Sequence, residues 1–120
     1  MGRVEPMKTL LDSQRRQLIA NHEAADEMDG DVAIRLEPVV KLFVCVGGNA
    51  TWLLTELDPE TNIAFGLCDL GLGFPELGYV SITELEETLG WRLERDRHWR
   101  PSKTLTEYAD DARSKGMVVA

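Results

Sequence analysis

Runs of apolar residues and the turns between them predict a group of strands in the middle of the chain. Residues 39–46 are β-branched and almost continuously apolar, a pattern that favours a central strand buried on both faces. A glycine-rich turn at 47–49 leads to a second strand at 51–57, and the two form a hairpin. A further turn at 58–62 precedes a third strand at 63–69. Three successive strands joined by short turns predict an antiparallel meander.

Three segments with helical spacing surround this meander. The first is expected from residue 9 to 21, the second from 82 to 89, and the third from 104 to 116. Thr9 is the expected N-cap of the first, and a glycine ends each of the other two. The Ser or Thr followed three residues later by Glu that forms a capping box occurs as Ser81 with Glu84, Thr83 with Glu86, and Thr104 with Glu107.

The remaining segments complete an α+β fold. Residues 79–81 can form a short fourth strand and residues 91–96 a last edge strand. Residues 22–37 are polar and acidic without periodicity, so we expect a flexible loop there, as at residues 1–8. The expected architecture is an antiparallel sheet of about four or five strands with N-terminal, middle and C-terminal helices packed on it. With 120 residues, 43% of them hydrophobic, the chain can build one core, so a single domain at 1–120 is predicted.

Composition argues against a membrane segment and against a metal or cofactor site. No apolar run approaches the roughly 18 residues of a membrane-spanning helix, and the first residues lack the apolar run of a secretory signal, so we expect a cytoplasmic protein. Cys45 and Cys68 lie in predicted strands and are expected to be buried, reduced thiols. They form no CxxC pair, and His22 and His98 are not at ligand spacing from them.

Charge is distributed unevenly along the chain, whose formal net charge is −8. Between residues 42 and 91 there is no Lys or Arg. The eight acidic residues of this stretch are Glu56, Asp58, Glu60, Asp69, Glu76, Glu84, Glu86 and Glu87. The sign then reverses, with five basic residues between 92 and 103. An acidic protein is repelled by nucleic acid at long range, so direct nucleic-acid binding is disfavoured.

The basic stretch has three possible interpretations. It can form an internal salt-bridge network with the acidic meander, which we favour, or the rim of a protein-binding surface. It can also bind single-stranded nucleic acid, because cations alternate with an aromatic ring there. The residues of that alternative patch are Arg95, Arg97, His98, Trp99 and Arg100.

The loop at 70–78 contains three glycines and a proline. It has neither the Lys-Ser/Thr of a P-loop nor the third glycine and helix start of a dinucleotide fingerprint, so phosphate binding is not expected. A tight crossover with Phe74 anchored against the meander is the favoured interpretation, because buried apolar side chains would offset the entropy lost by the glycines. The alternative is a partner-binding loop that exposes Leu72 and Phe74.

Carboxylates at strand ends suggest one catalytic alternative. Glu56, Asp58, Asp69 and Glu76 could together hold Mg²⁺ for phosphodiester cleavage, with His98 as a proton carrier. Many such nucleases place a Lys near the acidic pair, and this stretch has none. A nucleophile is also not indicated, because no Ser lies in a Gly-x-Ser-x-Gly elbow.

Several long motifs carry a family resemblance. They are TWLLTELDP at 51–59, AFGLCDLG at 64–71, GFPELGYVS at 73–81 and ERDRHWRP at 94–101. With them the chain resembles, from about residue 10 to 115, a bacterial family catalogued as domain of unknown function 2958. The resemblance implies a protein carried by plasmids, phages or integrative elements. It implies no catalytic residue.

The sequence leads to one functional hypothesis and one alternative. The hypothesis is a non-enzymatic acidic binding protein of a mobile genetic element, which could imitate nucleic acid and inhibit a host defence system such as restriction or CRISPR. Its partner would be a basic host or element-encoded protein. The expected binding residues are Glu56, Asp58, Glu60, Leu72, Phe74, Glu76, Glu84, Glu86 and Glu87. The alternative is a metal-dependent nuclease or a protein that processes single-stranded nucleic acid.

Overall fold

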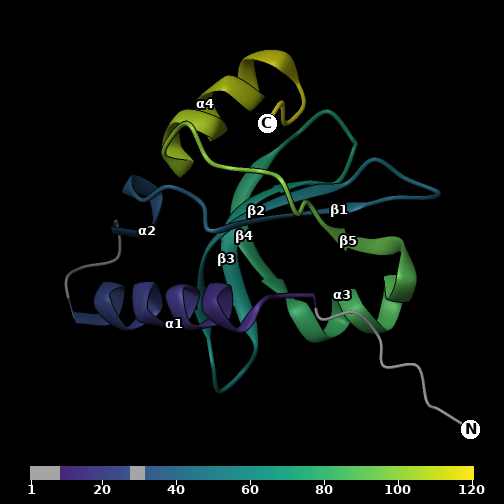
Figure 1. Ribbon diagram of the computed structural model, residues 1–120. Helices are drawn as coiled ribbons and strands as arrows, with labels where there is room; N and C mark the ends of the chain where they lie inside the picture. Colours follow the sequence, from purple (N-terminus) through teal and green to yellow (C-terminus); the bar gives the residue numbers. More distant parts are fainter. Residues whose placement is uncertain (1–8, 28–31) are drawn as a thin grey trace, which may run out of the picture.

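A computed structural model describes residues 9–27 and 32–120, in which five strands form one sheet (Figure 1). Neighbouring strands follow the order β4-β3-β2-β1-β5, and every pair is antiparallel. The strands are β1 (Val40–Val44), β2 (Thr51–Asp58), β3 (Ile63–Asp69), β4 (Glu76–Ser81) and β5 (Leu93–Arg95). The predicted meander is confirmed, and β5 is the predicted edge strand.

Among the described residues, two helices precede β1, one helix and a 3₁₀ turn lie between β4 and β5, and one helix follows β5. They are α1 (Asp12–Glu27), α2 (Val32–Arg35), α3 (Ile82–Leu89), the short 3₁₀ helix η1 (Gly90–Arg92) and α4 (Leu105–Lys115). The α+β fold class with N-terminal, middle and C-terminal helices is therefore confirmed.

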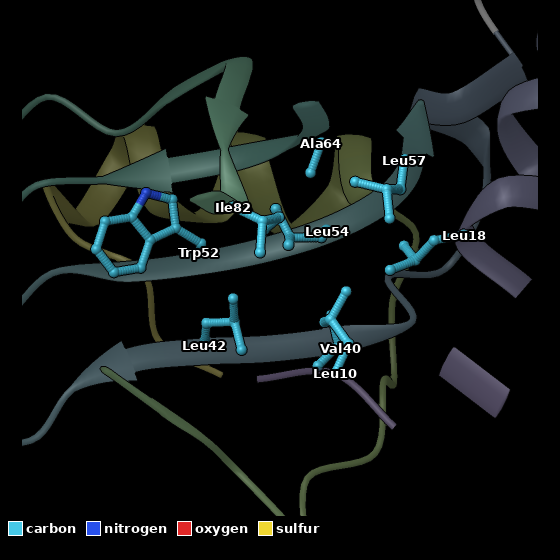
Figure 2. Close-up of a cluster of buried hydrophobic side chains, with 9 residues drawn as sticks. All are labelled: Leu10, Leu18, Val40, Leu42, Trp52, Leu54, Leu57, Ala64 and Ile82. Carbon is cyan, nitrogen blue, oxygen red and sulfur yellow. The ribbon is translucent and has the colours of Figure 1, made fainter. Parts of the chain in front are cut away.

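Apolar side chains pack on both faces of the sheet. Helices α1 and α3 cover one face, where Leu18 and Ile82 meet alternate residues of β1 and β2 (Figure 2). We call this first core cluster the α1/α3 core; it comprises Leu10, Leu18, Val40, Leu42, Trp52, Leu54, Leu57, Ala64 and Ile82. Helix α4 covers the opposite face. This second cluster, the α4 core, comprises Leu53, Leu67, Leu105, Tyr108, Ala109 and Ala112.

Strand β2 occupies the centre of the sheet and is buried on both faces, a role that the sequence predicted for β1. Trp52 and Leu54 enter the α1/α3 core, and Leu53 between them enters the α4 core. In β1 only Val40 and Leu42 are buried. The strand ends at Val44, because the chain then leaves the sheet for the hairpin turn.

The two thiols therefore differ in environment. Cys45 follows the end of β1 and is exposed, which corrects the expectation that it is buried. Cys68, in β3, is partly covered, and desolvation raises its pKa to about 11. A thiol with such a pKa stays protonated at neutral pH, which fits a packing role.

Helix α1 is longer than predicted and begins later. Thr9 is not its N-cap: the Oγ1 of Thr9 donates to Oε2 of Glu86 at 2.7 Å, and the helix starts at Asp12. At the other end it continues to Glu27, and α2 covers Val32–Arg35, where an irregular loop was expected. Residues 1–8 and 28–31 lie outside the described part of the chain. The extension of α1 depends on side-chain contacts that Asn21 and His22 make with β2.

The predicted caps of the later helices are confirmed. The side chain of Ser81 accepts from the N–H of Glu84, which selects this pair over the one that begins at Thr83. Thr104 and Glu107 form a reciprocal capping box with distances of 3.3 and 3.0 Å. Gly116 ends α4 in the left-handed conformation.

Two glycines that face each other across β3 and β4 offer a matched test of packing. A Cβ on Gly66 would lie 2.0 Å from the carbonyl oxygen of Leu53, whereas one on Gly78 would meet nothing within 4 Å. We predict that Gly66→Ala lowers the free energy of unfolding by about 3 kcal/mol or more, and that Gly78→Ala changes it by less than about 0.5 kcal/mol. Urea titration of the two variants measures both. Equal stabilities would contradict the close approach of β2 and β3.

Candidate protein-binding surfaces

Two segments that are distant in sequence meet at one end of the sheet, where β2 turns into β3. The turn between β2 and β3 lies against the start of α3, because the N–H of Ile82 donates to the carbonyl of Asn62 at 3.0 Å. The side chain of Asn62 also donates to Oγ1 of Thr83 at 3.0 Å. The carboxylates of these two segments therefore lie on one side of the protein, and all but the partly buried Asp58 are exposed. We call this surface the acidic edge; it comprises Asp58, Glu60, Glu84, Glu86 and Glu87.

Helix α3 directs its carboxylates outward. Ile82 is buried, and Leu85 and Leu89 pack against the α1/α3 core, so the remaining positions face solvent. Glu84 stands in the first turn, where the helix dipole favours a negative charge. The last turn contains no basic residue. Glu87 is therefore in an unfavourable place, near both the negative end of the helix and the like charge of Glu84.

Helix α4 shows the arrangement that stability favours. Its last turn contains Arg113 and Lys115, and Lys115 pairs with Asp111 one turn earlier at 2.9 Å. This ion pair and hydrogen bond hold the pKa of Asp111 below its usual value. The charges of α4 thus support the helix, whereas in α3 the charge of Glu84 suits the helix dipole and that of Glu87 does not. Glu87 is therefore the member of the acidic edge whose charge the stability of α3 does not explain.

One member of the acidic edge is tied to the start of α1. Glu86 accepts from Thr9, and a hollow of about 260 Å³ beside this bond is lined by Asp12 and Arg15 among others. Arg15 donates to Oδ1 of Asn62 at 3.0 Å. Asp12 was not expected here, because only the folded chain brings the start of α1 beside α3.

Two carboxylates of the expected binding set lie elsewhere. Glu56 is half-buried and its Oε1 lies 3.1 Å from Nδ1 of His22. Together with the 2.8 Å bond from the side chain of Asn21 to the carbonyl of Thr55, this contact holds the extra turns of α1 on β2. Glu76 begins β4 opposite Cys68, at the far end of the sheet from the β2–β3 turn.

The four carboxylates considered for a metal site do not converge. Asp69 is paired with Thr51 at one end of β2, and Asp58 with Ile63 at the other. That separation is about 23 Å at the usual rise of about 3.3 Å per residue. Among residues 9–27 and 32–120 there is no group of three or more potential metal ligands. The nuclease hypothesis therefore has no assembled ligand set in the described chain.

Asp69 instead organises the loop between β3 and β4. It is buried, and its two carboxylate oxygens accept from the N–H of Gly71 and from that of Val118, each at 2.9 Å. Gly71 and Gly73 adopt φ of +78° and +86°, which side chains with a Cβ rarely do. These constraints explain how the loop with its two glycines is held in place, while Gly78, the third glycine of the predicted loop, lies in β4.

The predicted burial of Phe74 is wrong. Phe74 is 79% exposed and Leu72 is 74% exposed, whereas Pro75 is buried. The loop is held by Asp69 and Pro75, so Phe74 is not needed as an anchor. The tail after α4 lies beside it and is also apolar at its surface. We call this second surface the apolar tip; it comprises the exposed residues Leu72 and Phe74 of the loop and Met117 and Val119 of the tail.

The comparison of the whole chain with known families identifies it. The family model described as Protein of unknown function (DUF2958) matches residues 9–119. The chain belongs to this family. No match was found among curated proteins or among solved structures.

The basic stretch of the DUF2958 chain contacts several neighbouring segments. Arg92 and Arg95 donate to the backbone carbonyls of Thr88 and Thr9, each at 3.3 Å, and Lys103 pairs with Asp111 at 3.8 Å. These three partners lie outside the strands of the meander. Trp99 packs against the α4 core, 6.1 Å from the ring of Tyr108, so its ring is not a free stacking platform.

Within the described ranges, none of the helices combines the length and the apolar character that crossing a bilayer requires.

Replacing Phe74 tests whether the apolar tip has a structural role. Because the ring is 79% exposed, we predict that Phe74→Ala changes the free energy of unfolding by less than about 0.5 kcal/mol. Leu67→Ala is the control, since Leu67 is fully buried and its truncation should cost about 2–5 kcal/mol. Thermal melts decide between the two roles. A large drop for Phe74→Ala would show that the ring supports the fold.

Charge changes in α3 test whether its carboxylates oppose folding. We predict that Glu87→Lys raises the free energy of unfolding by about 0.5 kcal/mol, because a base near the last turn suits the dipole and removes the repulsion with Glu84. Glu84→Lys, with the same change in net charge, should lower it. Urea titrations at low salt measure both, and the difference should shrink in about 1 M NaCl. Stabilisation by both variants would indicate only an effect of net charge.

Proposed function

We propose that this protein is a non-enzymatic binding protein that presents its acidic edge to a basic partner protein. The supporting observation is the joining of the β2–β3 turn to α3 through Asn62, which collects carboxylates from two segments on one surface. Part of that charge does not stabilise α3, because Glu87 lies three positions from the like charge of Glu84. Because this charge does not stabilise the fold, we expect that it contributes to the binding of a partner.

The net negative charge of the protein favours one class of partner. A net charge of −8 gives the protein a negative field that attracts a basic groove and steers its association at long range. On α3, Glu84 and Glu87 are three positions apart, which places their Cβ atoms about 5–6 Å from each other. Closely spaced acidic groups of this kind can occupy a groove that otherwise binds phosphates. The partner is therefore a nucleic-acid-binding protein with a basic surface.

The biological setting is an extension of this proposal. The family resemblance implies proteins carried by mobile elements, and such elements gain from blocking the nucleic-acid-binding proteins of the host. We therefore propose a host or element-encoded partner, with restriction and CRISPR systems as the first to examine. The apolar tip lies at the other end of the sheet. It would be a second contact surface, separate from the acidic edge.

The test is capture of bacterial proteins on the immobilised protein at low salt, followed by their identification. We predict recovery of a basic nucleic-acid-binding protein, which is released in about 0.5 M NaCl because the screening length then falls well below 10 Å. The triple variant Glu84→Gln, Glu86→Gln, Glu87→Gln should lose the partner, since it removes three charges of the acidic edge. Glutamine at 86 keeps an acceptor for Thr9.

The control is a second triple variant with the same change in net charge. It combines Glu37→Gln, Glu76→Gln and Asp110→Asn, three exposed carboxylates outside the acidic edge. This variant should retain the partner. Equal loss in both variants, or no basic partner in any sample, would contradict the proposal. Phe74→Ala in the same assay reports whether the apolar tip contributes.

A further inference from the structure

A second feature beside the acidic edge combines carboxylates with aromatic rings. Strands β2, β3 and β4 place Glu56, Phe65 and Tyr79 directly opposite one another, so the three side chains share one face of the sheet. Asp58 and Ile63 form the next row on that face. Together with His22 and Thr61, these residues line a cavity of about 300 Å³.

A β-bulge in β2 places the carboxylates beside the aromatic rings. The pairing of β2 with β3 shifts between Leu54 and Glu56, which moves the rest of β2 by one residue. After the bulge Leu57 enters the α1/α3 core, and Glu56 and Asp58 lie on the face of Phe65. With regular alternation the two carboxylates would point into the apolar core instead. The bulge therefore creates an acidic row beside an aromatic one.

The aromatic wall is accessible. The rings of Phe65 and Tyr79 meet edge to face with centroids 5.1 Å apart, which fixes the orientation of Tyr79. Even so, Tyr79 is 76% exposed. Phe65 packs against the α4 core, whereas Tyr79 extends beyond it. The wall therefore offers a ring that is held in place and still open to a ligand.

The Asp58 carboxylate of this cavity stays charged at neutral pH. The N–H of Glu60 donates to Oδ1 of Asp58 at 2.9 Å, and this bond holds the pKa of Asp58 below its usual value. Glu56 is held by His22 at 3.1 Å. A cavity with two carboxylates rejects anions, and its apolar rings disfavour a strongly hydrated small cation.

We propose that this cavity receives an arginine side chain of the basic partner. The inference rests on the proposed function, and it names the chemistry that the site recognises. A guanidinium is planar, weakly hydrated and always charged, so it can stack on Tyr79 while it pairs with Asp58. A lysine ammonium would gain the charge interaction but less of the stacking. Asp58 also belongs to the acidic edge, so the cavity and the edge form one continuous surface for a basic protein.

The experiment is a titration followed by two-dimensional amide NMR, with N-acetyl-arginine amide as the probe. N-acetyl-citrulline amide is the control ligand, because its urea group has nearly the same shape and no charge. We expect the arginine probe to shift the amide signals of residues 56–65 and 79 in a saturable way, and the citrulline probe to leave them unchanged. Saturable shifts of the same size with citrulline would overturn the assignment.

Variants locate the site. Tyr79→Leu should weaken the arginine probe about fivefold or more, because it removes the stacking ring. Trp91→Leu is the matched control, since Trp91 is 73% exposed and does not line the cavity; it should bind as the parent does. Asp58→Asn, which keeps an oxygen for the N–H of Glu60, should also weaken binding. Equal affinities for Tyr79→Leu and Trp91→Leu would overturn the proposal.

The capture experiment separates this proposal from the function on which it rests. If the partner binds the parent protein but Tyr79→Leu captures it as well as Trp91→Leu does, the arginine site is wrong and the acidic edge stands. If no basic partner is captured while the arginine probe binds the cavity as described, the acidic edge is wrong and the cation site stands.

Discussion

Burial of β2 on both faces is the constraint on which the rest of the structure depends. Its residues alternate between the α1/α3 core and the α4 core, so both faces of the sheet must be covered by helices. The hairpins on either side then fix which ends of the strands lie together. Asp58 and the β2–β3 turn come to one end, and Asp69 with the glycine loop to the other. The acidic edge and the apolar tip are separated because β2 spans the sheet between them.

The bulge in β2 connects this core to the candidate sites. Leu54 and Leu57 both enter the α1/α3 core although they are three residues apart, which strict alternation would not allow. The extra residue, Thr55, is buried, and its carbonyl accepts from Asn21 of α1. The same irregularity directs Glu56 towards His22. The extension of α1 and the position of the two carboxylates therefore have one cause.

Local patterns predicted the strands, the order of the meander and the caps of α3 and α4, because these depend on residues close together in the chain. Ser81 and Thr104 cap helices through partners three residues away, and such pairs are readable from sequence. The end of α1 was not predictable in this way. It depends on the contact between His22 and Glu56, which are 34 positions apart. Tertiary contacts there outweigh the weak helical pattern of residues 22–27.

For the candidate sites too, the sequence predicted what neighbouring residues determine and missed what tertiary contacts determine. The acidic residues of α3 and of the β2–β3 turn were identified from the charge pattern, but their meeting at Asn62 and the departure of Glu56 and Glu76 required the fold. The orientation of Phe74 depends on Asp69, which accepts from Val118, 49 positions away. Composition alone suggested an anchored ring. The loop is anchored by a carboxylate and a proline, and this leaves the ring at the surface.

The central claim is that the acidic edge is the surface that contacts a basic partner. Amide hydrogen exchange of the protein, free and in complex with the captured partner, tests it most directly, because it locates the contact without altering the chain. The account predicts that added protection is greatest in residues 58–62 and in α3, with the basic stretch at 92–103 unchanged. Protection confined to the basic stretch or to the apolar tip, with none in α3, would contradict it.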